Sequence, residues 1–497
     1  MYESALDSLI TLFTWPGPLY LVLGSLIGIL FGILPGLGGP QVVALLLPLT
    51  IGMDASHAII LLIGAMAATA FGGSIPAILI NTPGTATNAA TCLDGFPLAR
   101  QGKAGMAIAT AGISSALGAI FGAIVLTLIL PMGRQIVLAM SFAEYFMMAV
   151  MGIAVIVLVS RGSIWKGIIA GLVGFMLSSV GYDPVTGIVR YTFGVNYLYE
   201  GVKLMPVLIG LFAIAESIEL FIEKGKITKG EVGGNPFRNY FGGIKDGFKA
   251  VFSNLSLLIR SSFVGVVIGV IPGVGGAVAN FMAYVQAQQT CKNNENFGKG
   301  DIRGVIAPES ANNSKDGGAL VPTLIFGIPG SIEMAVLLGA LTIHGITPGP
   351  QLMLNNPSLI LILIYTLVIG NIFVSTVGVL AAPLLFRVTT IPTTYVAATV
   401  FTIAIIGAYA TDGIYYDAIV TVIFGIVGFT MKKLGFSRIA LVIALMLGQL
   451  AQKSFHQALI VGGPSIFFTR PISLILFIGT VVVLSLPFIQ SRKKGER

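Results

Sequence analysis

The fold is decided by the stretch Gly28-Ile-Leu-Phe-Gly32-Ile-Leu-Pro35-Gly36-Leu-Gly38-Gly39-Pro40, which occurs twice in the chain. The second copy is Gly265-Val-Val-Ile-Gly269-Val-Ile-Pro272-Gly273-Val-Gly275-Gly276, offset by 237 residues (272 minus 35). Each copy begins as an apolar helix with a glycine at every fourth position, so its glycines share one face that a second helix can approach closely. Each then reaches Pro-Gly-x-Gly-Gly. Proline removes a backbone donor and glycine weakens a helix, so each helix is predicted to break there.

The composition places these breaks inside a membrane. Of 497 residues, 55% are hydrophobic and 10% are charged, whereas soluble domains carry about 25% charged residues. Broken backbone at membrane depth is tolerated only where protein or a water-filled cavity covers it. Matching interruptions in two halves of a membrane protein therefore indicate a transport site. The alternative is that each Pro-Gly merely kinks a packed helix.

Apolar runs recur along the whole chain, so we predict an all-α polytopic membrane protein with about 12 transmembrane helices. The helices are expected to form two repeated halves with broken helices and re-entrant hairpins; whether the halves are parallel or inverted stays open. The first repeat is assigned to residues 1–222, a polar basic linker to residues 223–250, and the second repeat with a basic tail to residues 251–497. The net charge of +8 is attributed to cytoplasmic loops, which include the linker and the tail.

Each predicted break is followed by a second Pro-Gly turn. The first is Asn81-Thr82-Pro83-Gly84-Thr85, and the second is Gly327-Ile328-Pro329-Gly330-Ser331. Both lie within apolar sequence, which favours two re-entrant hairpins with polar tips over ordinary surface turns. Their hydroxyl, amide and carbonyl oxygens suit a small cation or a substrate hydroxyl. Between the first tip and the next span, residues 93–103 are predicted to be a polar connector.

A broken helix exposes unpaired N–H groups with a partial positive charge, which bind a carboxylate without a charged side chain. Carbonyl groups at the end of the first half-helix can coordinate a cation. The expected substrate-binding residues are therefore Pro35, Gly36, Gly38, Gly39, Asn81, Thr82, Gly84, Thr85, Asn88, Pro272, Gly273, Gly275, Gly276, Gly330 and Ser331.

A second polar segment, Ala307-Pro308-Glu309-Ser310-Ala311-Asn312-Asn313, precedes the second tip. An ionisable group in a membrane segment is a functional candidate. The alternative is a solvated connector, because four charged residues lie at positions 301, 303, 315 and 316. The expected cation or coupling residues are Thr82, Thr85, Ser331, Glu309, Asn312, Asn313 and Glu333. Glu144, Glu216 and Glu219 border apolar runs and are expected at the membrane interface.

Several chemistries are disfavoured by the absence of their motifs. The sequence has no Gly-x-x-x-x-Gly-Lys-[Ser/Thr] phosphate loop, no His-Glu-x-x-His and no Gly-x-Ser-x-Gly. Its three histidines show no metal-ligand spacing. We therefore expect no enzyme activity, no catalytic residue and no cofactor, with Na⁺ as a candidate coupling ion.

Three motifs together resemble the large membrane subunit of the tripartite tricarboxylate transporters, the TctA family. They are the doubled Gly-x-x-x-Gly-x-x-Pro-Gly-x-Gly-Gly, Asp94-Gly95-Phe-Pro-Leu-Ala-Arg-Gln-Gly-Lys103-Ala-Gly, and Ala307-Pro-Glu-Ser-Ala-Asn-Asn313. The resemblance covers nearly the whole chain. One departure is Ser310, where alanine is more usual in the family.

The resemblance implies a secondary transporter of a bacterial inner membrane that imports carboxylates, citrate-like tricarboxylates or related organic acids, on a Na⁺ or H⁺ gradient. It implies two partners, a small membrane subunit and a periplasmic solute-binding protein that delivers the substrate, and no nucleic acid. A passive anion channel and a non-transporting scaffold or receptor subunit are the alternatives.

Overall fold

The computed structural model describes residues 2–34, 36–159, 164–183, 185–223, 240–272 and 275–482, and these are helical apart from two short strands. The predicted all-α class is therefore confirmed. The N-terminal elements are α1 (Tyr2–Phe13), α2 (Gly17–Ile33), α3 (Gly39–Leu46), η1 (Leu47–Thr50), α4 (Ala55–Gly72), α5 (Ser74–Ile80), η2 (Ala86–Asn88), α6 (Ala89–Arg100), α7 (Ala104–Leu138), α8 (Phe142–Val159), α9 (Ile164–Ser178), β1 (Gly181–Tyr182), β2 (Val189–Arg190), η3 (Asn196–Glu200), α10 (Leu204–Leu208), η4 (Ile209–Ile214) and α11 (Ala215–Glu223).

The elements after residue 239 continue the helical pattern. They are α12 (Tyr240–Ser253), α13 (Leu255–Val270), α14 (Gly276–Thr290), α15 (Arg303–Phe326), α16 (Ile332–Ile343), α17 (Pro350–Asn355), α18 (Pro357–Leu385), η5 (Phe386–Thr390), α19 (Thr393–Asp412), α20 (Tyr415–Leu434), α21 (Arg438–Gly462) and α22 (Ile466–Thr469).

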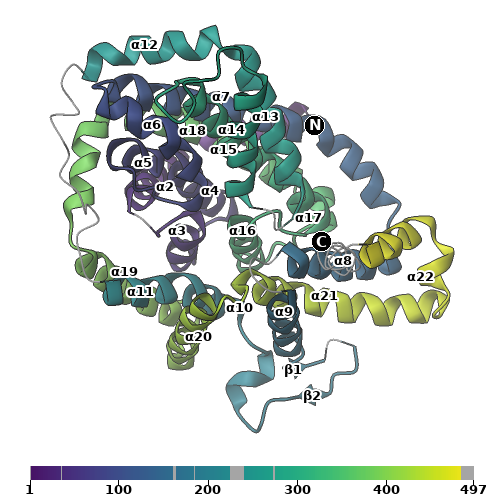
Figure 1. Ribbon diagram of the computed structural model, residues 1–497. Helices are drawn as coiled ribbons and strands as arrows, with labels where there is room; N and C mark the ends of the chain where they lie inside the picture. The colour runs from purple at the N-terminus through teal and green to yellow at the C-terminus, as the bar shows by residue number, and fades with distance from the viewer. Residues whose placement is uncertain are drawn as a thin grey trace, which may run out of the picture.

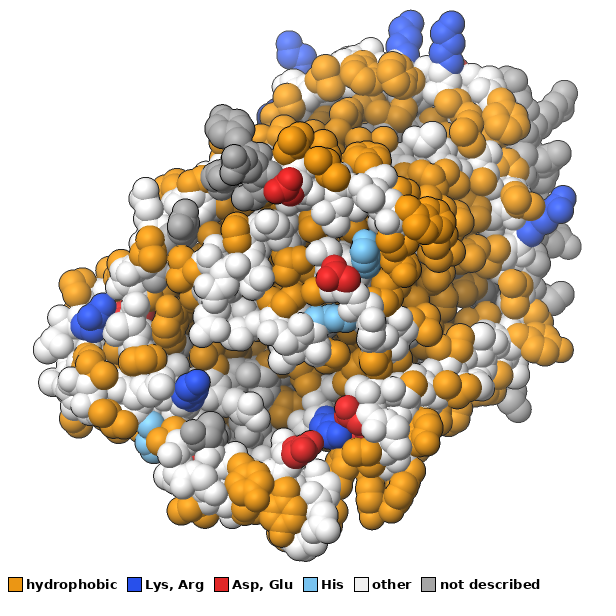
Figure 2. Space-filling model, turned by 180° about the vertical axis from the view of Figure 1, so that it is seen from behind, with side chains coloured by type: hydrophobic (Ala, Val, Ile, Leu, Met, Phe, Trp, Pro, Cys, Tyr) orange, Lys and Arg blue, Asp and Glu red, His pale blue; other side chains and the backbone are white. Residues whose placement is uncertain are grey.

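Six described helices are long and apolar enough to cross a membrane, and eight spans result if each of two bent helix pairs counts as one. The predicted total of about 12 is larger. Five further apolar helices of 10–17 residues are shorter than one crossing; at 1.5 Å per residue they reach at most about 25 Å, against a hydrocarbon core of about 30 Å. Figure 2 shows hydrophobic side chains over most of the visible face, with few and scattered charged groups.

The two bent pairs occupy corresponding places. Helices α1 and α2 meet at 69°, and α12 and α13 meet at 75°. Helix α12 crosses the top of the molecule in Figure 1 and exposes Phe241, Phe248 and Phe252 on its surface. Such a helix suits the membrane interface. The basic residues predicted for the linker at positions 224–238 lie outside the described residues.

The glycines of the repeated stretch lie where helices approach most closely. A Cβ at Gly28 would overlap the carbonyl oxygen of Ala65 in α4, and one at Gly269 would overlap the carbonyl oxygen of Lys315 in α15. Helix α2 thus packs on α4 and α13 on α15 with backbone close to backbone, as the four-residue glycine spacing predicted.

The segment at residues 93–103 was predicted to be a polar connector, and this prediction is wrong for most of its length. Helix α6 runs through it to Arg100, with Pro97 inside the last turns. The polar side chain of Asp94 is buried against a loop from the second half of the chain. Its polarity therefore reflects an internal contact and not exposure to water.

A short hairpin of β1 and β2 projects from the lower end of the molecule in Figure 1. Asp183 holds its turn by accepting hydrogen bonds from the N–H groups of Val185 (2.8 Å) and Thr186 (3.2 Å), and it pairs with Arg190 at 2.7 Å. The Val185 N–H bond, followed by the Thr186 N–H and the Arg190 charge, lowers the pKa of Asp183 against the opposing effect of burial.

The lowered pKa predicts that this turn is stabilised above the ordinary aspartate value of about pH 4 and loses that stabilisation as pH falls through the native value. Asp183→Asn should lower the amide-exchange protection of Val185 and Thr186 at pH 7 and remove the pH dependence. The exposed Asp246 offers a matched control, Asp246→Asn. Unchanged protection factors in Asp183→Asn would contradict this account.

Candidate functional site

Both predicted helix breaks are present. Helix α2 ends at Ile33, and the N–H of Leu34 closes it by donating to the Phe31 carbonyl oxygen at 3.0 Å. Helix α13 ends in the same way, with the N–H of Ile271 donating to Ile268 at 3.1 Å. We call residues 34–38 the first break and residues 271–275 the second break. Of the expected site residues, Pro35 and Gly273 lie outside the described residues.

The first break contacts the first hairpin tip, residues 81–85 (tip 1). The N–H of Gly36 donates to the carbonyl oxygen of Gly84 at 3.1 Å, and the N–H of Gly84 donates to Gly73 at 3.2 Å. Gly36 adopts φ +89°, which favours glycine. A Cβ at Gly38 would lie 3.0 Å from the Thr85 methyl group. Backbone groups left free by the break are thus met by the hairpin.

The start of α3, directly after the first break, contacts the segment that follows the second hairpin tip, residues 327–331 (tip 2). A Cβ at Gly39 would lie 2.7 Å from Cγ of Glu333, in the first turn of α16, and 3.4 Å from the Thr69 hydroxyl. In tip 2 itself, the N–H of Gly330 donates to the Thr323 hydroxyl at 3.1 Å. Ser331 serves as the N-cap of α16, since its hydroxyl accepts from the N–H of Met334 at 3.3 Å.

The start of α14, directly after the second break, contacts the segment that follows tip 1. Helix α14 begins at Gly276, where a Cβ would overlap the aliphatic part of Lys315 and lie 2.8 Å from the Thr87 methyl group. Asn280, one turn into α14, donates from Nδ2 to the Thr87 carbonyl oxygen at 2.6 Å. Pro272 and Gly275 of this break are half-buried. The first break thus contacts Gly84 and Thr85 of tip 1, and the start of α14 contacts Thr87, so both breaks lead to one meeting point at residues 84–87.

One ion pair lies at this meeting point. Lys315 Nζ lies 2.6 Å from Asp316 Oδ1, and the two side chains are 7% and 4% exposed. Both interact electrostatically with Glu333. One ammonium and two carboxylates give this group a formal net charge of −1 (1 minus 2). The solvated-connector alternative for this segment is wrong, because α15 is a buried helix of 24 residues.

Glu309 lies in the same buried helix at 0% exposure. Its Oε1 accepts hydrogen bonds from the hydroxyls of Ser74 (2.6 Å) and Thr91 (2.5 Å), and its Oε2 accepts from Ser115 at 2.9 Å. These donors come from α5, α6 and α7. A buried carboxylate needs such partners, because an unpaired buried charge is strongly destabilising.

The predicted asparagines of α15 lie deeper in the helix packing. Asn313 donates from Nδ2 to Oδ1 of Asn371 in α18, and its own Oδ1 has no partner among the described residues. Asn312 is fully buried, and neither side-chain atom has a partner there. Neither residue makes a hydrogen bond to the described residues of either break. Of the tip 1 residues, Asn81 is exposed in a left-handed conformation, and the Thr82 hydroxyl donates to the Ile80 carbonyl oxygen at 3.3 Å.

A further acidic residue, Glu216, lies next to the first break. A Cβ at Gly36 would lie 2.7 Å from Oε1 of Glu216. Glu216 is 3% exposed and pairs with Lys432 at 3.1 Å, and Lys432 also contacts Glu219. Glu216 follows η4, a single π-helical segment, and such segments often occur at functional sites.

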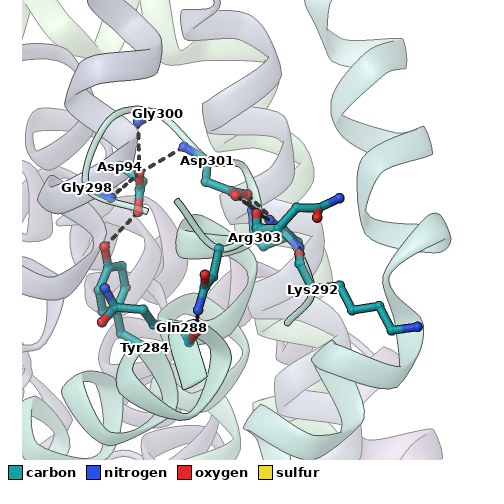
Figure 3. A network of polar contacts seen from close by, with 10 residues as sticks. Asp94, Tyr284, Gln288, Lys292, Gly298, Gly300, Asp301 and Arg303 are labelled. Atoms are coloured by element: carbon teal, nitrogen blue, oxygen red, sulfur yellow. Dashed lines mark hydrogen bonds and ion pairs between the residues drawn. The ribbon is translucent and has the colours of Figure 1, made fainter. Parts of the chain in front are cut away.

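A separate polar network fixes the loop before α15 (Figure 3). Oδ1 of Asp94 accepts hydrogen bonds from the N–H groups of Gly298, Gly300 and Asp301, each at 2.8 Å, and Oδ2 accepts from Tyr284 at 2.9 Å. The glycines adopt φ +81° and +108°, which lets three N–H groups converge on one carboxylate oxygen. This network joins α6 to the second half of the chain and is complete without a ligand.

An apolar cavity of about 400 Å³ lies between the start of α6 and α14. Ala86, Ala277, Phe281 and Met282 are among its lining residues. Its walls offer no group that binds a carboxylate, so the polar meeting point of breaks and tip 1 is the candidate site. Among the described residues, no group of three His, Cys, Asp or Glu side chains could hold a metal ion.

Four residues of this meeting point were not assigned to it from the sequence: Thr87, Asn280, Lys315 and Asp316. Two features of the sequence could have indicated Lys315 and Asp316. Residues 303–326 are rich in glycine, alanine and serine, which is typical of closely packed membrane helices. A Lys-Asp pair within such a helix neutralises its own charge. The sequence around Thr87 and Asn280 gave no comparable signal, because only the contact between these two residues in the folded protein marks them.

Broken helices and hairpin tips that meet inside an apolar helical protein define a class, the membrane transporters with discontinuous helices. Residues 19–443 match the model of the tripartite tricarboxylate transporter TctA family. The chain therefore belongs to this family, as the three motifs predicted, and is a transporter component and not an enzyme.

Two relatives come from Agrobacterium vitis. An uncharacterised 52.8 kDa protein of the TAR-I ttuC' 3'region is 33% identical over 475 residues, which cover 95% of this chain and 93% of the relative. An uncharacterised protein of the TAR-II ttuC' 3'region is 32% identical over 234 residues, which cover 46% of this chain and 97% of the relative. No solved structure matches.

The close contact of tip 1 with the first break yields a prediction. A Cβ at Gly84 would overlap the Gly32 carbonyl oxygen, so Gly84→Ala should push tip 1 off the break and destabilise the protein by about 1–3 kcal/mol. Gly370→Ala is the matched control, since its Cβ would meet atoms only at 3.6 Å and beyond. Thermal unfolding of the two purified variants measures the stability of each. A Gly84→Ala variant as stable as Gly370→Ala would contradict the packing.

Proposed function

We propose that this chain is the membrane-spanning permease of a tripartite secondary transporter that imports carboxylates. The observation that carries the proposal is that the first break and the start of α14, which follows the second break, both contact residues 84–87, beside one buried lysine. Citrate-like tricarboxylates or related organic acids are the proposed substrates, in keeping with the family's description. A small membrane subunit and a periplasmic binding protein are the proposed partners in a bacterial inner membrane.

The substrate carboxylate is proposed to bind at the second break. Helix α14 starts there with N–H groups that lack intrahelical partners, and such helix ends attract anions. The Lys315 side chain lies against the first residue of the same helix. An ammonium in a buried site attracts a carboxylate more strongly than it does in water. We also assign the glycines of both breaks and of tip 1 to the proposed site, because residues without a side chain let the substrate approach the backbone.

The charge at the site favours coupling to a cation. Lys315, Asp316 and Glu333 together carry a formal charge of −1, so an anionic substrate enters against like charge. A bound Na⁺ or H⁺ offsets that charge and makes substrate binding more favourable. Such a difference in affinity between two states is what coupling requires.

Two repeated halves offer a mechanism for movement. The amphipathic helix, broken helix and hairpin occur in the same order in both halves, as α1 to α6 and as α12 to α16. Helices of one half also pack against helices of the other: α21 packs on α8 and α9, and α11 packs on α19 and α20. We propose that these repeats amount to about 12 spans when half-helices are paired. The hairpin-bearing bundle would then rock against the rest of the protein.

Transport against a gradient separates this proposal from a channel. Vesicles containing the complete tripartite system should accumulate labelled citrate, or another carboxylate from a tested panel, when a Na⁺ or pH gradient is imposed. A passive channel only equalises concentrations. A scaffold subunit binds the periplasmic partner without any flux. Failure to accumulate any carboxylate with either gradient would refute the proposal.

The buried lysine can be tested without leaving a lone charge. Removing one partner alone would leave an unpaired buried charge, which costs about 3–5 kcal/mol. The double variant Lys315→Met/Asp316→Asn therefore removes both charges of the ion pair together. Carboxylate accumulation should fall about tenfold or more, since the substrate loses its cationic partner, while the protein remains in the membrane. The exposed Lys433 offers the control Lys433→Met. Equal uptake by both variants would exclude Lys315 from the substrate site.

A further inference from the structure

A chain of hydrogen bonds connects tip 1 with the buried carboxylate of Glu309. The hydroxyls of Thr87 and Thr85 lie 2.7 Å apart, and Thr85 donates to Asn88 Oδ1 at 2.6 Å. Asn88 donates from Nδ2 to the Ser74 hydroxyl at 2.8 Å, and Ser74 donates to Glu309 Oε1 at 2.6 Å. The chain thus runs from the meeting point of the breaks to the interior of α15.

The direction of every bond in this chain follows from the carboxylate. An ionised carboxylate only accepts hydrogen bonds, and a hydroxyl has one proton to donate. Ser74 uses its proton on Glu309, so Asn88 must present its NH₂ group to Ser74. The second amide hydrogen of Asn88 is taken by the Ala70 carbonyl oxygen at 2.8 Å, which fixes the amide orientation. Thr85 then donates to the remaining amide oxygen, and Thr87 must donate to Thr85.

The outer end of the chain therefore presents oxygen lone pairs and no free proton. Thr85 and Thr87 have both turned their hydroxyl protons inward. Next to them, Asn280 contacts the Thr87 carbonyl oxygen through its Nδ2, and its Oδ1 is fully buried without a partner among the described residues. Buried polar atoms are rarely left unpaired, so an acceptor without a donor at this place points to a ligand that supplies either a proton donor or a positive charge.

We propose that Thr85, Thr87 and Asn280 bind Na⁺ at the junction of tip 1 and the second break. This inference deepens the proposed function, on which it rests, by naming the coupling ion and its ligands. Hard oxygen ligands suit alkali and alkaline-earth ions, and the lack of a carboxylate among the three favours a monovalent ion. Hydroxyl and amide oxygens do not take up a proton at neutral pH, so these ligands do not serve H⁺.

Glu309 acts in this scheme as a positioning residue. It does not contact the ion, but its negative charge orients the four hydrogen bonds that leave the oxygen lone pairs facing the site. The Lys315 ammonium is held by Asp316 at 2.6 Å, which limits its repulsion of a cation nearby. The carboxylate of Glu309 thereby links α15 to tip 1, so ion binding at the tip affects helices of both halves.

Direct ion binding by the purified full chain tests the inference without any transport assay. Thermal unfolding is measured in NaCl, in KCl and in choline chloride at equal ionic strength. NaCl should raise the unfolding temperature in a saturable way, more than KCl does. Thr87→Val, which removes one ligand and keeps the shape, should raise the half-saturating Na⁺ concentration about tenfold or more. Glu309→Gln should weaken the response in the same direction, because a glutamine amide no longer forces Ser74 to donate.

Two control variants keep the test specific. Thr87→Ser retains the hydroxyl and should retain the Na⁺ response. Thr366→Val removes a buried hydroxyl whose hydrogen bond, in the described part of the chain, stays within α18, and it should leave the response unchanged. Absence of a specific NaCl effect in the wild type, or an unchanged effect in both Thr87→Val and Glu309→Gln, would overturn the inference. Carboxylate accumulation without Na⁺ binding would overturn the ion site and leave the proposed function standing. Na⁺ binding without carboxylate accumulation would support the ion site and contradict the proposed function.

Discussion

Backbone groups that a broken helix leaves unpaired must find partners inside the protein, and this requirement shapes the structure. In a membrane interior no water is available for them. The Gly36 N–H is met by the Gly84 carbonyl oxygen, and the Gly84 N–H is met in turn by Gly73. Tip 1 therefore covers the first break, and the break gives this tip a place to pack.

Glycine makes this arrangement possible at the level of helix packing. Without side chains at Gly28 and Gly269, α2 and α13 approach α4 and α15 until backbones touch. In lipid there is little hydrophobic force between helices, so close van der Waals contact has a larger share in holding them. The same contacts set the depth of each break relative to its hairpin.

The charges at the meeting point connect structure with proposed coupling. In the proposed site the Lys315 ammonium is the group that faces a carboxylate substrate, and the two carboxylates near it leave the group with a formal charge of −1. A cation that binds at tip 1 offsets this charge. The hydrogen-bond chain from Thr87 to Glu309 points every proton away from the tip, which leaves oxygen lone pairs for that cation. Attraction of both solutes thus depends on groups from both halves of the chain.

The sequence by itself determined the helical membrane class, the family, the two breaks and the two polar tips, because each is a local property of hydrophobicity, glycine spacing and proline. It also singled out Glu309. Only the tertiary structure decided which tip meets which break, that residues 93–100 form a helix, and that Lys315 and Asp316 are buried. The three hydroxyls on Glu309 lie 235, 218 and 194 residues away in the chain. No local pattern records such pairings, since they arise when distant helices pack.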